Sequence, residues 1–260
     1  MNTSAAYPAP ARWSGWLVIA GLLSIWEALV RLGAVSPMLA PAPTVIGGAM
    51  AAMLGDGLLL PHLRATVIRL TVGIGLGASV GAALGLAMGW LPLLRRAIDP
   101  LVAALHPIPK VAIFPLLIVV LGIGEESKIF AVALTAFFPT LINAMAGVRE
   151  IAPTHIELAR NYGASPFALV RRVLLPGALP MLLTGLRIAT SVGFLAAISV
   201  EMVASRDGLG ALLVNSWQMF RVERVYATIF VIALLGMFNT SLIRRLRHRL
   251  VPWTAVDGER

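Results

Sequence analysis

The stretch that decides the fold is LTVGIGLGASVGAALGLAMGWLPLL, residues Leu70–Leu94, which contains no charged side chain. A helix needs about 20 mostly apolar residues to cross the roughly 30 Å hydrocarbon core of a bilayer. The whole chain has the same character, because 58% of its 260 residues are hydrophobic and only 13% are charged. A typical soluble domain carries about 25% charged residues. The sequence therefore predicts an all-α integral membrane protein.

Working outward from this stretch, we expect about six transmembrane helices. Two further segments contain no charged residue, namely Ile129–Val148 and Val225–Ile243. Three others contain charges or prolines, which survive in a span only where protein or water satisfies the freed polar groups. These are Trp13–Val30, Leu101–Gly124 and Gly177–Ala204. The first could instead be a signal peptide, but its start is poorly charged and no clean cleavage site follows, which favours a retained helix.

The distribution of the cations predicts the orientation. Lys and Arg number 21 against 12 Asp and Glu, a net charge of +9, and the cations lie between the apolar runs. Cations placed in this way mark cytoplasmic loops rather than a nucleic-acid-binding face. If both termini are placed in the cytoplasm, more of the Lys and Arg residues lie on the cytoplasmic side of the membrane than on the outer side. We expect residues 1–12 and 251–260 to be cytoplasmic tails and residues 13–250 a single transmembrane domain.

The second span carries a glycine repeat with a period of four, at Gly73, Gly77, Gly81, Gly85 and Gly89. This spacing places glycines on one stripe of a helix, where a neighbouring helix can approach closely. Packing within the protein is the favoured interpretation. A subunit interface or a sliding contact during gating is the alternative.

The longest cytoplasmic loop, residues 149–176, changes from an apolar to an amphipathic pattern. A helix can start at Pro153 or Thr154, with Glu157 placed to cap its first turn. Gly163 can end this helix in a left-handed conformation. A helix–turn–helix is therefore expected on the cytoplasmic face.

The second helix of this loop is predicted to begin at Ser165, an N-cap residue followed by Pro166. We expect the segment Leu175–Gly177 to break it where the chain re-enters the membrane. The helical spacing leaves two interpretations open. The loop could form helices that lie on the lipid head groups, or it could be a binding surface for a soluble partner.

The same loop resembles a known family. Glu157-Leu158-Ala159, then Gly163, then Val173-x-Leu175-Pro176 follow the pattern E-A-A-x3-G-x9-I-x-L-P. That pattern is typical of the permease subunits of bacterial binding-protein-dependent ABC importers. Leu158 and Val173 are mild departures from it.

Further motifs extend the resemblance over roughly residues 35–250. They include Pro107-x-Pro109-Lys110, Gly122-Ile123-Gly124-Glu125, His62 with Arg69, and Gly185-Leu186-Arg187. They are similar to the nitrate/sulfonate/taurine-type branch, which also includes permeases for pyrimidine precursors and riboflavin. The resemblance implies a small, anionic solute such as an aliphatic sulfonate, taurine or nitrate. A neutral pyrimidine or vitamin precursor is the alternative.

The resemblance also implies the partners. It predicts a homodimer in the bacterial inner membrane, two cytoplasmic ATP-binding subunits, and an extracytoplasmic solute-binding protein. ATP and Mg²⁺ would bind the ATPase, so no cofactor and no enzymatic activity are expected in this chain. The residues that would contact the ATPase are Glu157, Ala159, Tyr162, Gly163, Ala164, Phe167, Leu175 and Pro176.

Among the charged residues inside predicted spans are Glu27, Arg187 and Glu201. Such charges usually face a bundle interior or a water-filled path, so all three are candidates for the translocation path. Arg187 and Glu201 are 14 residues apart, about 21 Å along one helix, which is too far for a direct pair. Arg69 or Arg206 could pair with Glu201. Arg187 could be a structural ion pair, a side chain reaching the cytoplasmic face, or a cation on an anion path.

Two other classes of membrane protein are possible, an ion-gradient-driven transporter and a membrane-embedded enzyme. A transporter driven by an ion gradient often shows inverted repeats and acidic residues near mid-membrane, and the sequence shows no convincing repeat. A membrane-embedded enzyme would need a nucleophile–base pair or a His/Asp cluster in its spans, and none is evident. The chain has no cysteine, and its histidines lack metal-binding spacing.

Overall fold

The computed structural model describes residues 14–252, with side chains from Leu17 onward, and this range is helical without any strand. The predicted all-α class is confirmed. The helices are α1 Ser14–Arg31, α2 Pro43–Gly55, α3 Leu59–Trp90, α4 Pro92–Leu105, α5 Phe114–Leu121, α6 Glu125–Arg149, α7 Pro153–Asn161, α8 Pro166–Leu169, α9 Leu175–Ala204, α10 Leu209–Gln218 and α11 Val222–Leu250. A 3-10 turn, η1 (Lys110–Ile113), precedes α5, and a π-helical turn, η2 (Val170–Leu174), precedes α9.

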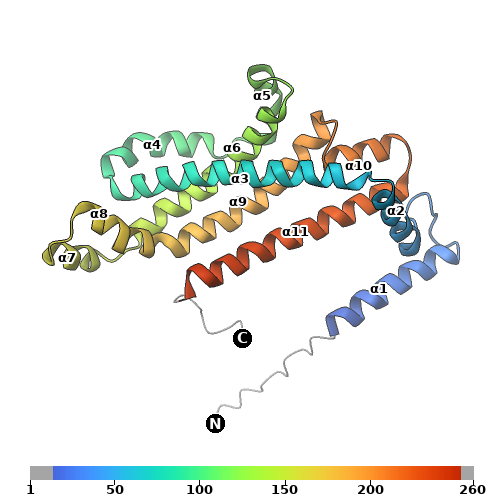
Figure 1. The fold of residues 1–260 in the computed structure, drawn as a ribbon, viewed down its shortest axis with the longest axis horizontal. Helices are drawn as coiled ribbons and strands as arrows, with labels where there is room; N and C mark the ends of the chain where they lie inside the picture. The colour runs from blue at the N-terminus through green and yellow to red at the C-terminus, as the bar shows by residue number, and fades with distance from the viewer. Residues whose placement is uncertain (1–13, 253–260) are drawn as a thin grey trace, which may run out of the picture.

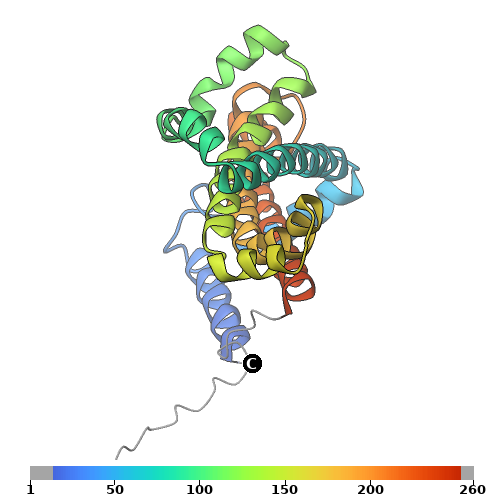
Figure 2. The same cartoon turned by 90° about the vertical axis from the view of Figure 1, so that its left-hand side faces the viewer.

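The centre of the molecule is a bundle in which α6 packs between α3 and α9 (Figure 1). Apolar side chains of these helices form one buried cluster, which includes Ile74, Val132 and Ala197. Helix α11 packs on α2, α9 and α10, whereas α1 contacts α2 at the edge of the bundle. Helices α7 and α8 lie at one end of the bundle, and α2 and α10 lie at the opposite end (Figure 1). Figure 2, viewed from the α7–α8 end, shows α4 and α5 on one side of the bundle and α1 on the other.

The glycine stripe of α3 faces α6. A Cβ atom added at Gly77 would lie 2.7 Å from the carbonyl carbon of Ala133, and one at Gly73 would lie 2.7 Å from Cβ of Val132. Gly81, Gly85 and Gly89 are equally close to α6, whereas Gly75 has open space around it. The backbones of α3 and α6 approach closely because the stripe has no side chains.

The structure has four helices that are long and apolar enough to span a bilayer within the described residues: α3, α6, the continuous run Pro166–Ala204, and α11. A fifth span results if α4 and the η1–α5 segment, which meet at 85°, are counted together. Helix α1 covers 18 residues at the first predicted span. The bend lies inside the predicted span Leu101–Gly124, where Pro107 and Pro109 interrupt the helix, and α4 already begins at Pro92.

Two further boundaries differ from the prediction. Helix α3 begins at Leu59, before the charge-free stretch, and therefore includes Arg64 and Arg69. The predicted break at Leu175–Gly177 is wrong, since η2 continues directly into α9. Pro176 lies near the start of α9, directly after the π-helical turn η2, and the helix continues through it. Of the predicted tails, residues 1–12 and 253–260 lie outside the described residues.

Candidate functional site

The segment Pro153–Leu169 folds as a short helical hairpin, which we call the α7–α8 hairpin. Helix α7 starts with Pro153 after Ala152, and no side chain caps it, so the expected cap by Glu157 is wrong. Gly163 has φ of +74°, which confirms the predicted left-handed turn. Ser165 Oγ accepts a hydrogen bond from Ala168 N at 3.3 Å, which confirms the predicted N-cap of α8.

The tip of this hairpin exposes large apolar side chains. Tyr162 is 85% exposed and Phe167 is 74% exposed. Glu157 is also exposed, and its carboxylate makes no hydrogen bond or ion pair with any residue of the described range 14–252. A hollow beside the tip is lined by residues of both halves of the loop, including Ala159, Val173 and Pro176. An exposed apolar patch next to an unpaired charge is typical of a protein-docking surface.

The base of the hairpin is held firmly to the bundle. Val148, Leu174 and Ala178 form a buried cluster, against which Ile156 of α7 packs. The Arg160 guanidinium lies 5.7 Å from the ring centre of Trp90 at the end of α3, a cation–π contact. These contacts connect the hairpin to α3, α6 and α9.

The opposite end of the bundle contains a buried ion-pair network centred on Arg69 of α3. Its Nη1 donates to Glu201 of α9 at 2.8 Å, and both side chains are at most 1% exposed. Its Nε and Nη2 donate to the two carboxylate oxygens of Glu125 of α6 at 2.7 and 2.6 Å. Nη2 also contacts the Asp207 carboxylate. Of the two cations considered for Glu201, Arg69 is the one that pairs with it.

Other groups complete this network. Glu201 also accepts from Thr66 Oγ1 at 2.9 Å and from Gly210 N at 3.0 Å. Lys128 Nζ donates to Glu125 at 2.9 Å. Burial raises the pKa of Asp207, but the hydrogen bond and the charge of Arg69 outweigh it, so the net pKa is lowered from the ordinary value of 3.8. The network joins α3, α6, α9 and α10 at the end far from the hairpin.

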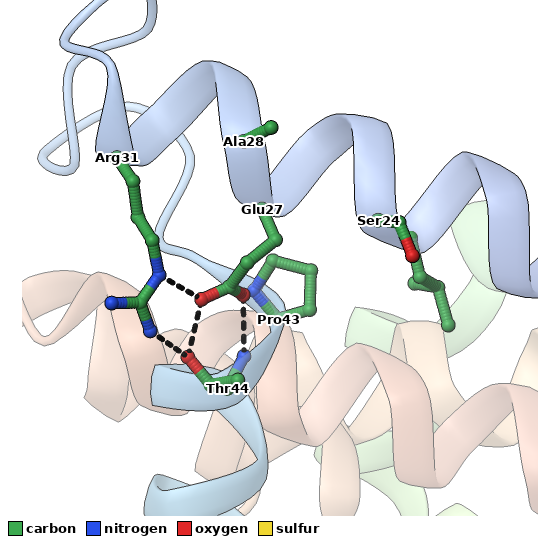
Figure 3. Close-up of a pocket in the computed structure, with 7 residues that line it drawn as sticks. Ser24, Glu27, Ala28, Arg31, Pro43 and Thr44 are labelled. Carbon is green, nitrogen blue, oxygen red and sulfur yellow. Dashed lines mark hydrogen bonds and ion pairs between the residues drawn. The ribbon is translucent and has the colours of Figure 1, made fainter.

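Glu27 serves a different contact, between α1 and α2 (Figure 3). Its carboxylate accepts from Thr44 N at 3.1 Å, from Thr44 Oγ1 at 2.8 Å, and from Arg31 Nε at 2.6 Å. An acidic side chain at the N-terminus of α2 is favourable for two reasons. It accepts a hydrogen bond from a free backbone N–H, and its negative charge is attracted by the positive end of the helix dipole.

Arg187 lies partway along α9 and is exposed on the surface of the single chain. Its guanidinium makes no hydrogen bond or ion pair with any residue between 14 and 252. The structure thus places Glu27, Arg187 and Glu201 in three separate environments. Only Arg187 lacks a partner, and a lone charge at membrane depth requires water or a second protein surface.

Some members of the network were missed by reasoning from the sequence. Thr66, Glu125 and Asp207 come from three different segments, and no local spacing links them. A signal was nevertheless present, because Gly124-Glu125 and His62 with Arg69 are among the motifs of the family resemblance. His62 Nδ1 lies 3.0 Å from the carbonyl oxygen of Gly208, beside the network.

The bundle, the bent helix pair and the exposed hairpin describe an all-α protein with several helices long and apolar enough to span a membrane. Comparison with known proteins gives the family. The model of the binding-protein-dependent transport system inner membrane component matches residues 73–252, and the chain belongs to this family. It is therefore a multi-pass permease subunit of an ABC importer, which works with an ATPase and a binding protein, and ATP is used on the separate ATPase chain.

Similar proteins support this assignment. The chain is 34% identical to the taurine transport system permease protein TauC of Escherichia coli, over 90% of this chain and 87% of TauC. It is 36% identical to the riboflavin transport system permease protein RibX of Chloroflexus aurantiacus, over 90% and 87%. The fold matches a chain of the MetNI methionine ABC transporter with a TM-score of 0.66 at 21% identity, covering 75% of this chain and 97% of that one.

Proposed function

We propose that this permease forms the translocation path for a small organic anion of the alkyl sulfonate or taurine type. The α7–α8 hairpin would be the coupling surface for the ATPase. The observation that carries the coupling assignment is the exposed, unpaired tip on a rigid base. Tyr162, Phe167 and Glu157 face outward there, while Ile156 joins the tip to the buried cluster.

The coupling surface consists of the exposed residues of the hairpin together with those that shape it. Tyr162 and Phe167 would enter an apolar groove of the ATPase, and Glu157 would pair with a cation of the partner. Gly163 provides the turn between the helices. The small side chains of Ala159 and Ala164 would let the ATPase approach the hairpin closely. Leu175 and Pro176 connect the surface to α9.

The assembly we propose contains two copies of this chain, two ATP-binding subunits, and one extracytoplasmic binding protein. Both termini would be cytoplasmic, on the same side as the α7–α8 hairpin. The Arg69 network would then lie near the extracytoplasmic side. In a dimer, the exposed face of α9 would be covered by the second copy or line the aqueous path, which gives Arg187 the environment that it lacks in the single chain.

Of the three path candidates Glu27, Arg187 and Glu201, we propose that Arg187 attracts the solute. Glu27 and Glu201 would act in structure, because each carboxylate already accepts several hydrogen bonds. Support for a solute that carries a sulfonate group comes from the name of TauC, the taurine permease similar to this chain. A neutral, heterocyclic solute is the second candidate, because RibX is equally similar.

The experiment is ATP-driven uptake by the complete complex in proteoliposomes, with taurine, ethanesulfonate and riboflavin as solutes. We expect uptake of the sulfonates, dependent on the binding protein and on ATP. Glu157→Lys should abolish uptake while the chain stays in the membrane. Uptake of riboflavin alone would overturn the anionic solute, and uptake without the ATPase would overturn the coupled mechanism.

A further inference from the structure

A largely apolar pocket with a few polar side chains lies at the bend between α4 and α5, and we call it the bend pocket. Its volume is about 510 Å³, within the range of roughly 300–1,000 Å³ found for small-molecule sites. The bend segment forms one wall, with His106 and Lys110, and side chains of α6 and α9 form the other. The pocket opens on the same helix α9 that carries Arg187.

The charge in this pocket is the ammonium group of Lys110. It donates to the carbonyl oxygens of Leu105 at 3.0 Å and Ile108 at 2.8 Å, and it also contacts the carbonyl oxygen of His106. The ammonium lies 4.4 Å from the ring centre of Phe138. Lys110 thus binds the free carbonyl groups at the end of α4 and places a positive charge at the pocket wall.

Three further polar side chains line the pocket. The ring of His106 lies 5.6 Å from that of Phe138 and makes no hydrogen bond within the described part of the chain. Thr135 and Ser199 donate to carbonyl groups of their own helices, both at 2.8 Å, so their oxygens keep free lone pairs. Leu195 adds apolar wall between them. The lining therefore combines a cation, a free imidazole, two hydroxyl groups and apolar surface.

We propose that the bend pocket is a transient binding site for an alkyl sulfonate on the translocation path. This inference rests on the proposed function. The sulfonate group would lie toward Lys110 and His106, and the alkyl body against Phe138 and Leu195. The hydrogens of Lys110 are already bonded to carbonyl groups, so the ammonium attracts the anion mainly through its charge. Weak attraction of this kind suits a path, because a tightly held solute would not leave it.

The absence of cysteine allows a direct test, since a single introduced cysteine is the only thiol of this chain. Ser199→Cys would be treated with the anionic reagent sulfonatoethyl methanethiosulfonate in the complete complex. The labelling rate, read from the mass of this chain, would be measured with and without ethanesulfonate. Ser191→Cys is the matched control, because Ser191 lies on the same helix and does not line the pocket.

We expect ethanesulfonate to slow the labelling of Ser199→Cys at least fivefold and to leave Ser191→Cys unchanged. His106→Phe, combined with Ser199→Cys, keeps an aromatic ring beside Phe138. It should raise the ethanesulfonate concentration needed for half-protection about tenfold, as loss of one hydrogen bond to a charged group does. Equal protection at both cysteines, or none at Ser199→Cys, would overturn the bend pocket. ATP-driven uptake by the unmodified complex, measured in parallel, shows separately whether the proposed function stands.

Discussion

The guanidinium of Arg69 lies 2.8 Å from the carboxylate of Glu201, although the two residues are 132 positions apart and both side chains are buried. This contact joins α3 to α9 at the end of the bundle far from the α7–α8 hairpin. The Arg69 network therefore links α3, α6 and α9, the same three helices that the hairpin contacts at the other end of the bundle.

Removal of Arg69 should destabilise the permease strongly. Arg69→Met leaves the buried Glu201 carboxylate without its cation, and breaking a buried pair in this way costs about 3–5 kcal/mol. Arg64→Met is the matched control, since Arg64 is an exposed residue of the same helix, and it should change the free energy of unfolding by less than about 0.5 kcal/mol. Denaturation in detergent measures both. Equal stability of the two variants would contradict a structural role for the network.

Asp207 should make stability depend on pH at the acidic end. Its pKa is lowered in the folded protein, so its contribution is fully present above the ordinary value of 3.8. That contribution is lost as the pH falls through the lower, folded pKa. The effect should be modest, because the Asp207 side chain is 52% exposed. Asp207→Asn should flatten the acid limb of a curve of melting temperature against pH, and an unchanged limb would show that Asp207 does not contribute.

The glycine stripe of α3 should tolerate no side chain where it meets α6. Gly77→Ala would place a Cβ against the carbonyl group of Ala133, and we expect a loss of at least 1–3 kcal/mol. Gly75→Ala lies on the same helix with open space around it, so it should be neutral or slightly stabilising. The melting temperatures of the two variants in detergent measure this difference in stability. A neutral Gly77→Ala would mean that α3 and α6 can separate without cost.

The sequence predicted those features that depend on local pattern. The all-α membrane class, the left-handed turn at Gly163 and the N-cap at Ser165 each follow from a few neighbouring residues. Helix ends were less predictable. The charge-free stretch begins at Leu70, yet α3 begins at Leu59, and Arg69 within it is paired with carboxylates from other segments. Arg64 is an exposed residue of the same helix, so a charge does not by itself end a helix.

The candidate site was predictable in one half only. The hairpin is contiguous in the chain, so its spacing could be compared with a known motif. The Arg69 network and the bend pocket are assembled from residues far apart in sequence, and periodicity says nothing about such contacts. The continuous passage from η2 into α9 was also unforeseen. A wide π-helical turn carries the chain to Pro176 without the break that proline usually causes.

At Gly163, the backbone conformation rather than the space for a side chain should determine which substitutions are tolerated. No atom would contact a Cβ added there, but φ is +74°. Asn tolerates this conformation, whereas a β-branched residue does not, and the left-handed conformation costs about 1–2 kcal/mol for ordinary residues. Gly163→Val should abolish ATP hydrolysis stimulated by the binding protein, and Gly163→Asn should retain much of it. Full stimulation with Gly163→Val would show that the turn is not needed for coupling.

The α7–α8 hairpin is central to this account, and its contact with the ATPase can be measured by cross-linking from a single cysteine. Phe167→Cys, at the exposed tip, and Met38→Cys, an exposed position near the N-terminus of α2, would each be introduced into the cysteine-free chain. Both would be treated with a short bifunctional reagent in the assembled complex. We predict a cross-link from Phe167→Cys to the ATPase and none from Met38→Cys. A cross-link to the ATPase from Met38→Cys alone would contradict the account.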